Sequence, residues 1–92
     1  MIINFTCEAT QSLFEGKRVS RFVQIERVAT RKLQQLECAN SLEFLRSPPG
    51  NRLEALHGNR QGQHSIRIND QYRLCFIWSD TGVRDVEIVD YH

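Results

Sequence analysis

The chain has 92 residues, of which 40% are hydrophobic and 25% are charged, and its formal net charge is +1 at pH 7. This length predicts one domain, residues 1–92, with a small hydrophobic core, and the composition is ordinary for a globular protein. No apolar run approaches the roughly 20 residues of a membrane span and no signal-peptide pattern opens the chain, so we expect a cytoplasmic protein without a membrane partner.

The first half of the chain predicts helices. Residues 2–5 suit a short strand, and a short helix that is capped by Thr6 and runs to Phe14 follows. The clearest helix comes next, because apolar residues recur at spacings of three and four and therefore share one face. These residues are Phe22, Ile25, Ala29, Leu33 and Leu36. Residues 42–45 predict one further helical turn, and the prolines at 48–49 then exclude regular structure.

The second half of the chain predicts strands. Four runs have the alternation and the β-branched or aromatic content of strands, and short turns join them. They span residues 53–57, 64–68, 72–78 and 83–91. Strands at this spacing favour an antiparallel sheet, and helices that precede the sheet in the chain indicate the α+β class.

The hairpin formed by the second and third of these strands has one favourable register. A loop at residues 69–71 places Ile66 opposite Leu74 and gathers apolar side chains on one face, and a shift by one residue would destroy that face. The same register places Arg67 directly opposite Arg73, and like charges in such a pair repel. A phosphate between the two guanidinium groups would relieve the repulsion. The alternative is that both arginines point apart into water.

Several kinds of chemistry are disfavoured by motifs that the chain lacks. Its cysteines are widely spaced, which argues against a disulfide framework and a zinc site. They are Cys7, Cys38 and Cys75. There is no His-Glu-x-x-His pattern, no Gly-x-Ser-x-Gly elbow and no glycine-rich phosphate loop before a helix. We therefore expect no metal, no cofactor and no covalent catalysis.

Histidine, carboxylate and arginine groups remain as the candidate chemistry. The histidines are His57, His64 and His92. Glu54 precedes His57 by three residues, and Asp90 and Tyr91 immediately precede His92. Five arginines and only two acidic residues lie between positions 46 and 73, which favours contact with a polyanion. Such a set suits cleavage of RNA by its own 2′-hydroxyl, in which a base and an acid transfer protons and a cation stabilises the phosphate.

An ordered series of motifs also favours an RNA-cleaving protein. It consists of Leu-x-x-Leu-x-Gly-x-Arg-x-Gly from residue 53, Ser-Ile-Arg-Ile-Asn from 65, Tyr-Arg-x-x-Phe from 72 and Asp-Tyr-His from 90. In this series the chain resembles the HigB-type toxins of the RelE superfamily. The resemblance runs over essentially the whole chain and is strongest from Arg52 to His92. It implies the RelE-like, microbial ribonuclease-type fold, a small antiparallel sheet packed against two N-terminal helices.

The resemblance also implies a function. Such toxins belong to type II toxin–antitoxin systems and cleave translated messenger RNA in the decoding site of the ribosome, by 2′-hydroxyl attack and without a metal ion. Their partners are a cognate helix-turn-helix antitoxin, operator DNA only through that antitoxin, and the ribosome with its message. RelE-like folds also include toxins that poison gyrase. A toxin that acts by binding alone, as a gyrase poison or an RNA- or ribosome-binding module, is therefore the alternative.

Roles for individual residues follow by position in the motifs. The resemblance makes His92 the first candidate for general acid or base, and makes Arg73 the arginine that stabilises the phosphate. Asp90 and Tyr91 belong to the same terminal cluster and could orient the substrate or the imidazole.

The general base stays open at this point. Members of the family vary at the positions of Glu54 and His57, where some carry a histidine and a lysine, so Glu54, His57 and Asp90 are all candidates. Glu54 could instead be a structural partner of a nearby arginine. Arg60 and Arg67 are expected to contact the RNA backbone rather than to take part in proton transfer.

Overall fold

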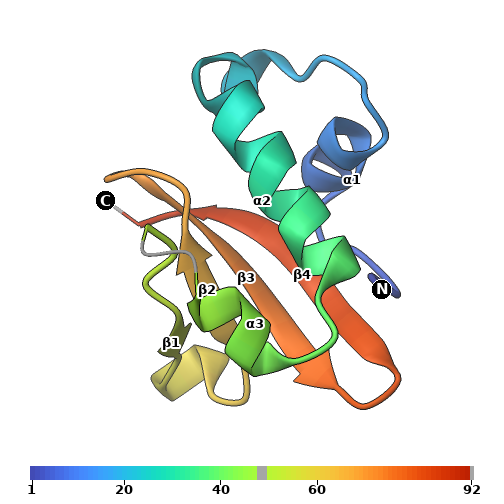
Figure 1. Ribbon diagram of the computed structural model, residues 1–92. Helices are drawn as coiled ribbons and strands as arrows, with labels where there is room; N and C mark the ends of the chain where they lie inside the picture. The colour runs from blue at the N-terminus through green and yellow to red at the C-terminus, as the bar shows by residue number, and fades with distance from the viewer. Residues whose placement is uncertain (48–49, 92) are drawn as a thin grey trace.

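The computed structural model describes residues 1–47 and 50–91, so the proline pair and His92 lie outside the described residues. Within these ranges helices come first and an antiparallel sheet of order β1-β2-β3-β4 follows, which confirms the predicted α+β class (Figure 1). The elements are α1 (Glu8–Phe14), η1 (Ser20–Ile25), α2 (Glu26–Cys38), α3 (Leu42–Arg46), β1 (Glu54–Ala55), η2 (Gly58–Arg60), β2 (His64–Arg67), β3 (Tyr72–Ser79) and β4 (Gly82–Asp90). None of the described helices is long and apolar enough to cross a membrane.

The amphipathic segment that starts at Phe22 is divided into two helices. Its first part, η1, is a 3-10 helix, and α2 begins only at Glu26. Apolar residues three positions apart, such as Phe22 and Ile25, fit the three-residue turn of a 3-10 helix as well as an α-helix, so their spacing could not distinguish the two. Phe22 and Ile25 are buried together with Ala29 and Leu33, which confirms the predicted apolar face.

The N-terminal residues cover the outer edge of β4 without forming the strand predicted for residues 2–5. Ile2 and Phe5 make only isolated parallel bridges, to Val83 and Val86 respectively. A bulge shifts the register of the β3–β4 ladder in this region, so the strand edge is not regular enough for continuous pairing. The edge is nevertheless covered, which protects β4 from pairing with other chains.

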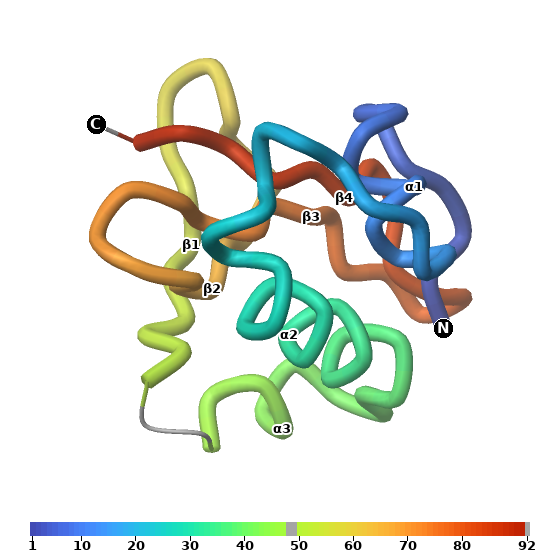
Figure 2. The backbone as a smooth tube through the Cα atoms, turned by 90° about the horizontal axis from the view of Figure 1, so that it is seen from above, coloured from blue at the N-terminus to red at the C-terminus, as the bar shows by residue number. Residues whose placement is uncertain are grey.

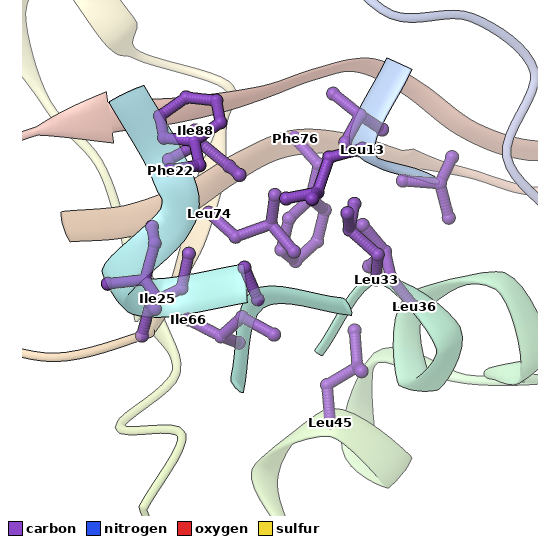
Figure 3. Packing of buried hydrophobic residues seen from close by; sticks show 14 of the residues in the cluster. Leu13, Phe22, Ile25, Leu33, Leu36, Leu45, Ile66, Leu74, Phe76 and Ile88 are labelled. Atoms are coloured by element: carbon purple, nitrogen blue, oxygen red, sulfur yellow. The ribbon is translucent and has the colours of Figure 1, made fainter. Parts of the chain in front are cut away.

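The β2–β3 hairpin has the predicted register, with Arg67 opposite Arg73 and Ile66 opposite Leu74. One face of the sheet therefore packs against the helices, and Figure 3 shows their side chains meeting those of β3 and β4 in the core. The large, fully buried hydrophobic residues are Leu13, Phe22, Leu33, Leu36, Leu45, Ile66, Leu74, Phe76, Val83 and Val86.

The other face of the sheet carries most of the predicted site residues. Cross-strand partners share a face because side chains alternate along a strand. One row of partners consists of Glu54, Ser65, Cys75 and Glu87, and the adjacent row of Arg67, Arg73 and Val89. We call this surface the arginine face. Helices α2 and α3 both lie on the opposite side of the sheet, so neither covers it (Figure 2).

Candidate functional site

An open pocket of about 610 Å³ lies on the arginine face. Its walls include four of the predicted site residues, together with a basic and an acidic residue that sequence reasoning did not select. The four are Glu54, Arg67, Arg73 and Tyr91, and the two additional residues are Arg52 and Asp70. The sheet therefore brings together residues from the segment before β1, from the β2–β3 hairpin and from the end of β4.

Arg73 forms the buried part of this pocket and is 9% exposed. Its Nε donates to Ser65 Oγ at 2.7 Å, and its Nη2 donates to the carbonyl of Arg52 at 2.7 Å and to that of Ser65 at 3.3 Å. The same Nη2 lies 2.9 Å from Glu54 Oε1. Among the described residues, Nη1 has no hydrogen bond or ion pair, whereas Nε and Nη2 are both held. Sequence reasoning missed Ser65, although its place two residues before Arg67 put it on this face.

The carbonyl that holds Arg73 belongs to a segment anchored by Asn51. This residue is fully buried, and its side chain donates to the carbonyl of Leu45 at 3.0 Å and accepts from the Lys32 ammonium. Its own carbonyl accepts from the backbone N–H of Arg67 at 2.6 Å. Arg52 follows with a left-handed backbone (φ 46°). Through Asn51, the helices position one side of the pocket. Nothing in the local sequence indicated this role for Asn51.

The predicted pairing of like charges exists, but carboxylates of the chain relieve it. Arg67 forms an ion pair with Asp70, and Arg73 forms one with Glu54. The two guanidinium groups thus have separate partners, although their backbones lie directly opposite each other. Nearby acidic side chains therefore supply the negative charge in the free protein, a third possibility beside the phosphate and the two solvated arginines that the register had suggested.

Arg60 is also paired rather than free. Its Nη1 lies 3.2 Å from Glu87 Oε1 on β4 and donates to Gln63 Oε1 at 3.1 Å. Both members of the ion pair are about two-thirds buried, with side-chain exposures of 33% and 31%. This contact joins the loop after β1 to β4 across the arginine face. Glu87 was not a predicted site residue, because no local pattern connects it with Arg60.

Strand alternation separates the residues of the Asp-Tyr-His cluster that the structure describes. Tyr91 lines the arginine-face pocket, where Arg73 Cζ lies 6.0 Å from the centre of its ring. Asp90 pairs with Tyr72 in the sheet, accepts from Gln71 Nε2 at 3.0 Å and lines a different pocket beside Phe22. Two neighbours in the sequence therefore point to opposite faces of the sheet. His92 lies outside the described residues, and its role stays a prediction.

Only one of the three candidate bases lies with Arg73. Glu54 lines the pocket, whereas Asp90 does not and His57, exposed between β1 and η2, is not among the lining residues either. His64 stacks on Phe76 with ring centres 6.2 Å apart. Among the residues that the structure describes, no group of three histidine, cysteine or acidic side chains could hold a metal ion.

A buried thiol lies against the tyrosine of the pocket. Burial raises the pKa of the Cys75 thiol, and burial together with Cys75 raises the pKa of the Tyr91 hydroxyl. A raised pKa means that the native state keeps a proton that the unfolded chain releases. The free energy of unfolding should therefore fall as the pH rises above about 8.5, the ordinary thiol pKa.

Replacing the buried thiol should remove part of this pH dependence. We expect the Cys75→Ala variant to lose less unfolding free energy than the wild type between about pH 7.5 and 9.5, where the ordinary thiol titrates. Urea denaturation at several pH values measures this, and the slope against pH is compared rather than the absolute stability. The exposed Cys38 supplies the control, and Cys38→Ala should retain the wild-type slope. An unchanged slope in Cys75→Ala would contradict the prediction.

The family model described as the RelE-like toxin of type II toxin–antitoxin system HigB matches residues 4–92. The chain is 42% identical to Toxin HigB-1 of Vibrio cholerae serotype O1 over 82 residues, 87% of this chain and 86% of that protein. It is 37% identical over 60 residues to an uncharacterized protein of Haemophilus influenzae, covering 65% of this chain and 59% of the relative.

A solved structure shares the fold. The YoeB dimer from Staphylococcus aureus aligns with a TM-score of 0.58 and 22% sequence identity, over 99% of this chain and 94% of the other. Together with the family match, this likeness confirms the predicted RelE-like architecture, in which helices pack on one face of a small antiparallel sheet. The family match includes every helix and strand described above and all residues of the arginine-face pocket.

Proposed function

Because the chain belongs to the HigB-like toxin family, the RelE-like toxins of type II toxin–antitoxin systems, we propose that it is a ribosome-dependent messenger-RNA endonuclease. Membership of this family implies an antitoxin as partner. In our proposal this antitoxin is a helix-turn-helix protein that alone connects the toxin with operator DNA. The substrate is messenger RNA held in the decoding site of a translating ribosome, and the compartment is the cytoplasm.

The observation that carries the proposal is the held guanidinium of Arg73 at an open pocket. Its Nε and Nη2 have acceptors within the protein, and Nη1 remains for a non-bridging phosphate oxygen. When a 2′-hydroxyl attacks phosphorus, negative charge develops on those oxygens, and a preorganised donor stabilises it without having to reorient. The P–O5′ bond breaks, which leaves a 2′,3′-cyclic phosphate and a 5′-hydroxyl. Arginine supplies the positive charge in this scheme, so no metal ion is needed.

Two proton transfers complete the reaction. We assign the general base to Glu54, because its carboxylate contacts Arg73 and is 59% exposed at the pocket, where it can meet the 2′-hydroxyl of a bound strand. A phosphate on Nη1 would leave Glu54 beside the neighbouring Nη2, where its exposed carboxylate can accept the proton. His92 is then the acid that protonates the leaving O5′, and Tyr91 orients the substrate. His57 and Asp90 are the alternatives for the base.

A mapped cleavage assay tests this function. Purified protein is added to messenger RNA alone and to messenger RNA on programmed ribosomes, with and without EDTA. We expect cuts only on ribosomes, insensitive to EDTA, that end in 2′,3′-cyclic phosphate. The His92→Gln variant should cut about 10²–10⁴-fold more slowly, the usual contribution of one proton-transfer group. If the folded protein cuts neither RNA, the proposal is wrong, and a gyrase supercoiling assay would then test action by binding.

A further inference from the structure

Two arginines of the arginine face, together with Arg60, which reaches this face from η2, are each joined to a carboxylate. Arg73 and Glu54 are 2.9 Å apart, Arg60 and Glu87 are 3.2 Å apart, and Arg67 pairs with Asp70. Sheet register places Arg67, Arg73, Glu54 and Glu87 on this one face. Both expected RNA contacts, Arg60 and Arg67, are therefore neutralised within the free protein.

This pairing has a consequence for the binding of RNA. Affinity for a nucleic acid strand depends on how many phosphates the protein neutralises, and each neutralised phosphate releases counterions. A paired arginine must exchange its carboxylate for the phosphate, and the displaced carboxylate then repels the strand. Arg52, exposed at the pocket, has no ion pair with a described residue, and the net charge of the whole chain is only +1. Free RNA thus meets little uncompensated positive charge on this face.

We propose that Glu87 and Asp70 are specificity-determining residues that keep the arginine face from capturing free RNA. By occupying Arg60 and Arg67, they make the exchange of carboxylate for phosphate unfavourable for a strand that diffuses in solution. A strand that the ribosome already holds beside the pocket has a high effective concentration, so the same exchange then proceeds. This inference rests on the proposed function for the identity of the RNA, but the ion pairs themselves are independent of any catalytic step.

The Arg67–Asp70 and Arg60–Glu87 ion pairs differ in solvent exposure, and the effect of breaking each pair should differ accordingly. The side chain of Asp70 is 100% exposed, whereas that of Glu87 is 31% exposed and faces an arginine of similar exposure. Interactions between exposed charges are screened by water and salt, while sheltered pairs are screened less. Glu87→Gln should therefore raise the affinity for free RNA more than Asp70→Asn does.

The test is the binding of free RNA by the Asp70→Asn/Glu87→Gln double variant. The probe is a short, labelled, single-stranded 2′-O-methyl oligonucleotide, which cannot be cut by 2′-hydroxyl attack, and no ribosome is present. Two additional phosphate contacts should steepen the plot of log K against log salt by about 1.4, at about 0.7 for each contact with a single strand. Affinity should accordingly fall by a further factor of about seven between 50 and 200 mM salt.

A matched control separates this local effect from net charge. Glu43 pairs with Arg46 at 3.5 Å and Glu15 with Lys17 at 3.3 Å, and neither pair lies in the pocket of the arginine face. The Glu15→Gln/Glu43→Gln variant removes the same two charges and should keep the wild-type slope. The inference is overturned if the first double variant keeps the wild-type slope, or if the control steepens equally.

A single variant and the ribosome assay distinguish a failure of this inference from an unfolded variant or from a failure of the proposed function. If thermal melting shows that Glu87→Gln unfolds the protein, Asp70→Asn alone should still steepen the slope, by up to about 0.7, and an unchanged slope would refute the inference. The ribosome assay above tests cleavage, whereas this assay reads binding only. A protein that fails to cut messages yet shows the steeper slope would refute the proposed function and retain this inference, and the reverse result would do the opposite.

Discussion

An Arg73→Lys variant should cut ribosome-bound message about 10²–10³-fold more slowly than the wild type, the usual cost of losing one preorganised donor to a developing oxyanion. Lysine keeps the positive charge but lacks the planar fork that lets arginine bond several acceptors in fixed directions. Ser65 and the carbonyl of Arg52 bond two different guanidinium nitrogens, Nε and Nη2, and the single nitrogen of an ammonium cannot occupy both positions while also facing a phosphate. Single-turnover cleavage on programmed ribosomes measures the loss.

Arg67→Lys is the matched control for this experiment. Arg67 lies directly opposite Arg73 and lines the same pocket, but its partner is the exposed Asp70 rather than a set of buried acceptors. We expect a much smaller loss of rate, because a backbone contact needs charge more than direction. Urea denaturation must show that both variants are folded. Equal rates for Arg73→Lys and the wild type would exclude Arg73 from transition-state stabilisation.

A Leu33→Ala variant should lower the free energy of unfolding by about 2–5 kcal/mol. Leu33 on α2 is fully buried, and Figure 3 shows it in the core between the helices and the sheet. Its truncation removes apolar contacts and leaves a cavity that rigid neighbours fill only in part. Small domains have about 5–15 kcal/mol in total, so this one change would remove a large share of the stability.

Urea denaturation measures this loss, and Val23→Ala is the control. Val23 is 38% exposed on η1, and exposed substitutions usually change stability by less than about 0.5 kcal/mol. The Leu33→Ala protein that remains folded should cut message at the wild-type rate, in contrast to Arg73→Lys. A loss below about 1 kcal/mol would mean that α2 does not pack against the sheet as described.

Three features of the fold were predictable from the amino-acid sequence: the α+β class, the apolar face of α2 and the register of the β2–β3 hairpin. Alternation decides the register because a slip of one residue would move Ile66 and Leu74 out of the core, and one buried face makes that slip costly. Motif spacing from Arg52 onward pointed to the family that the comparisons show. The helix face and the hairpin register are local, since each depends on residues a few positions apart within one helix or one hairpin.

The partners of the arginines became visible only in the folded protein. Glu87 reaches Arg60 and Ser65 holds Arg73 because separate strands meet in the sheet, and no periodicity within one segment encodes such contacts. Strand alternation separates Asp90 from Tyr91, and the fold decided which of the two lines the pocket of Arg73. Periodicity reveals which face of an element is apolar, whereas the partner of a polar side chain depends on elements that are distant in the chain and meet only when it folds.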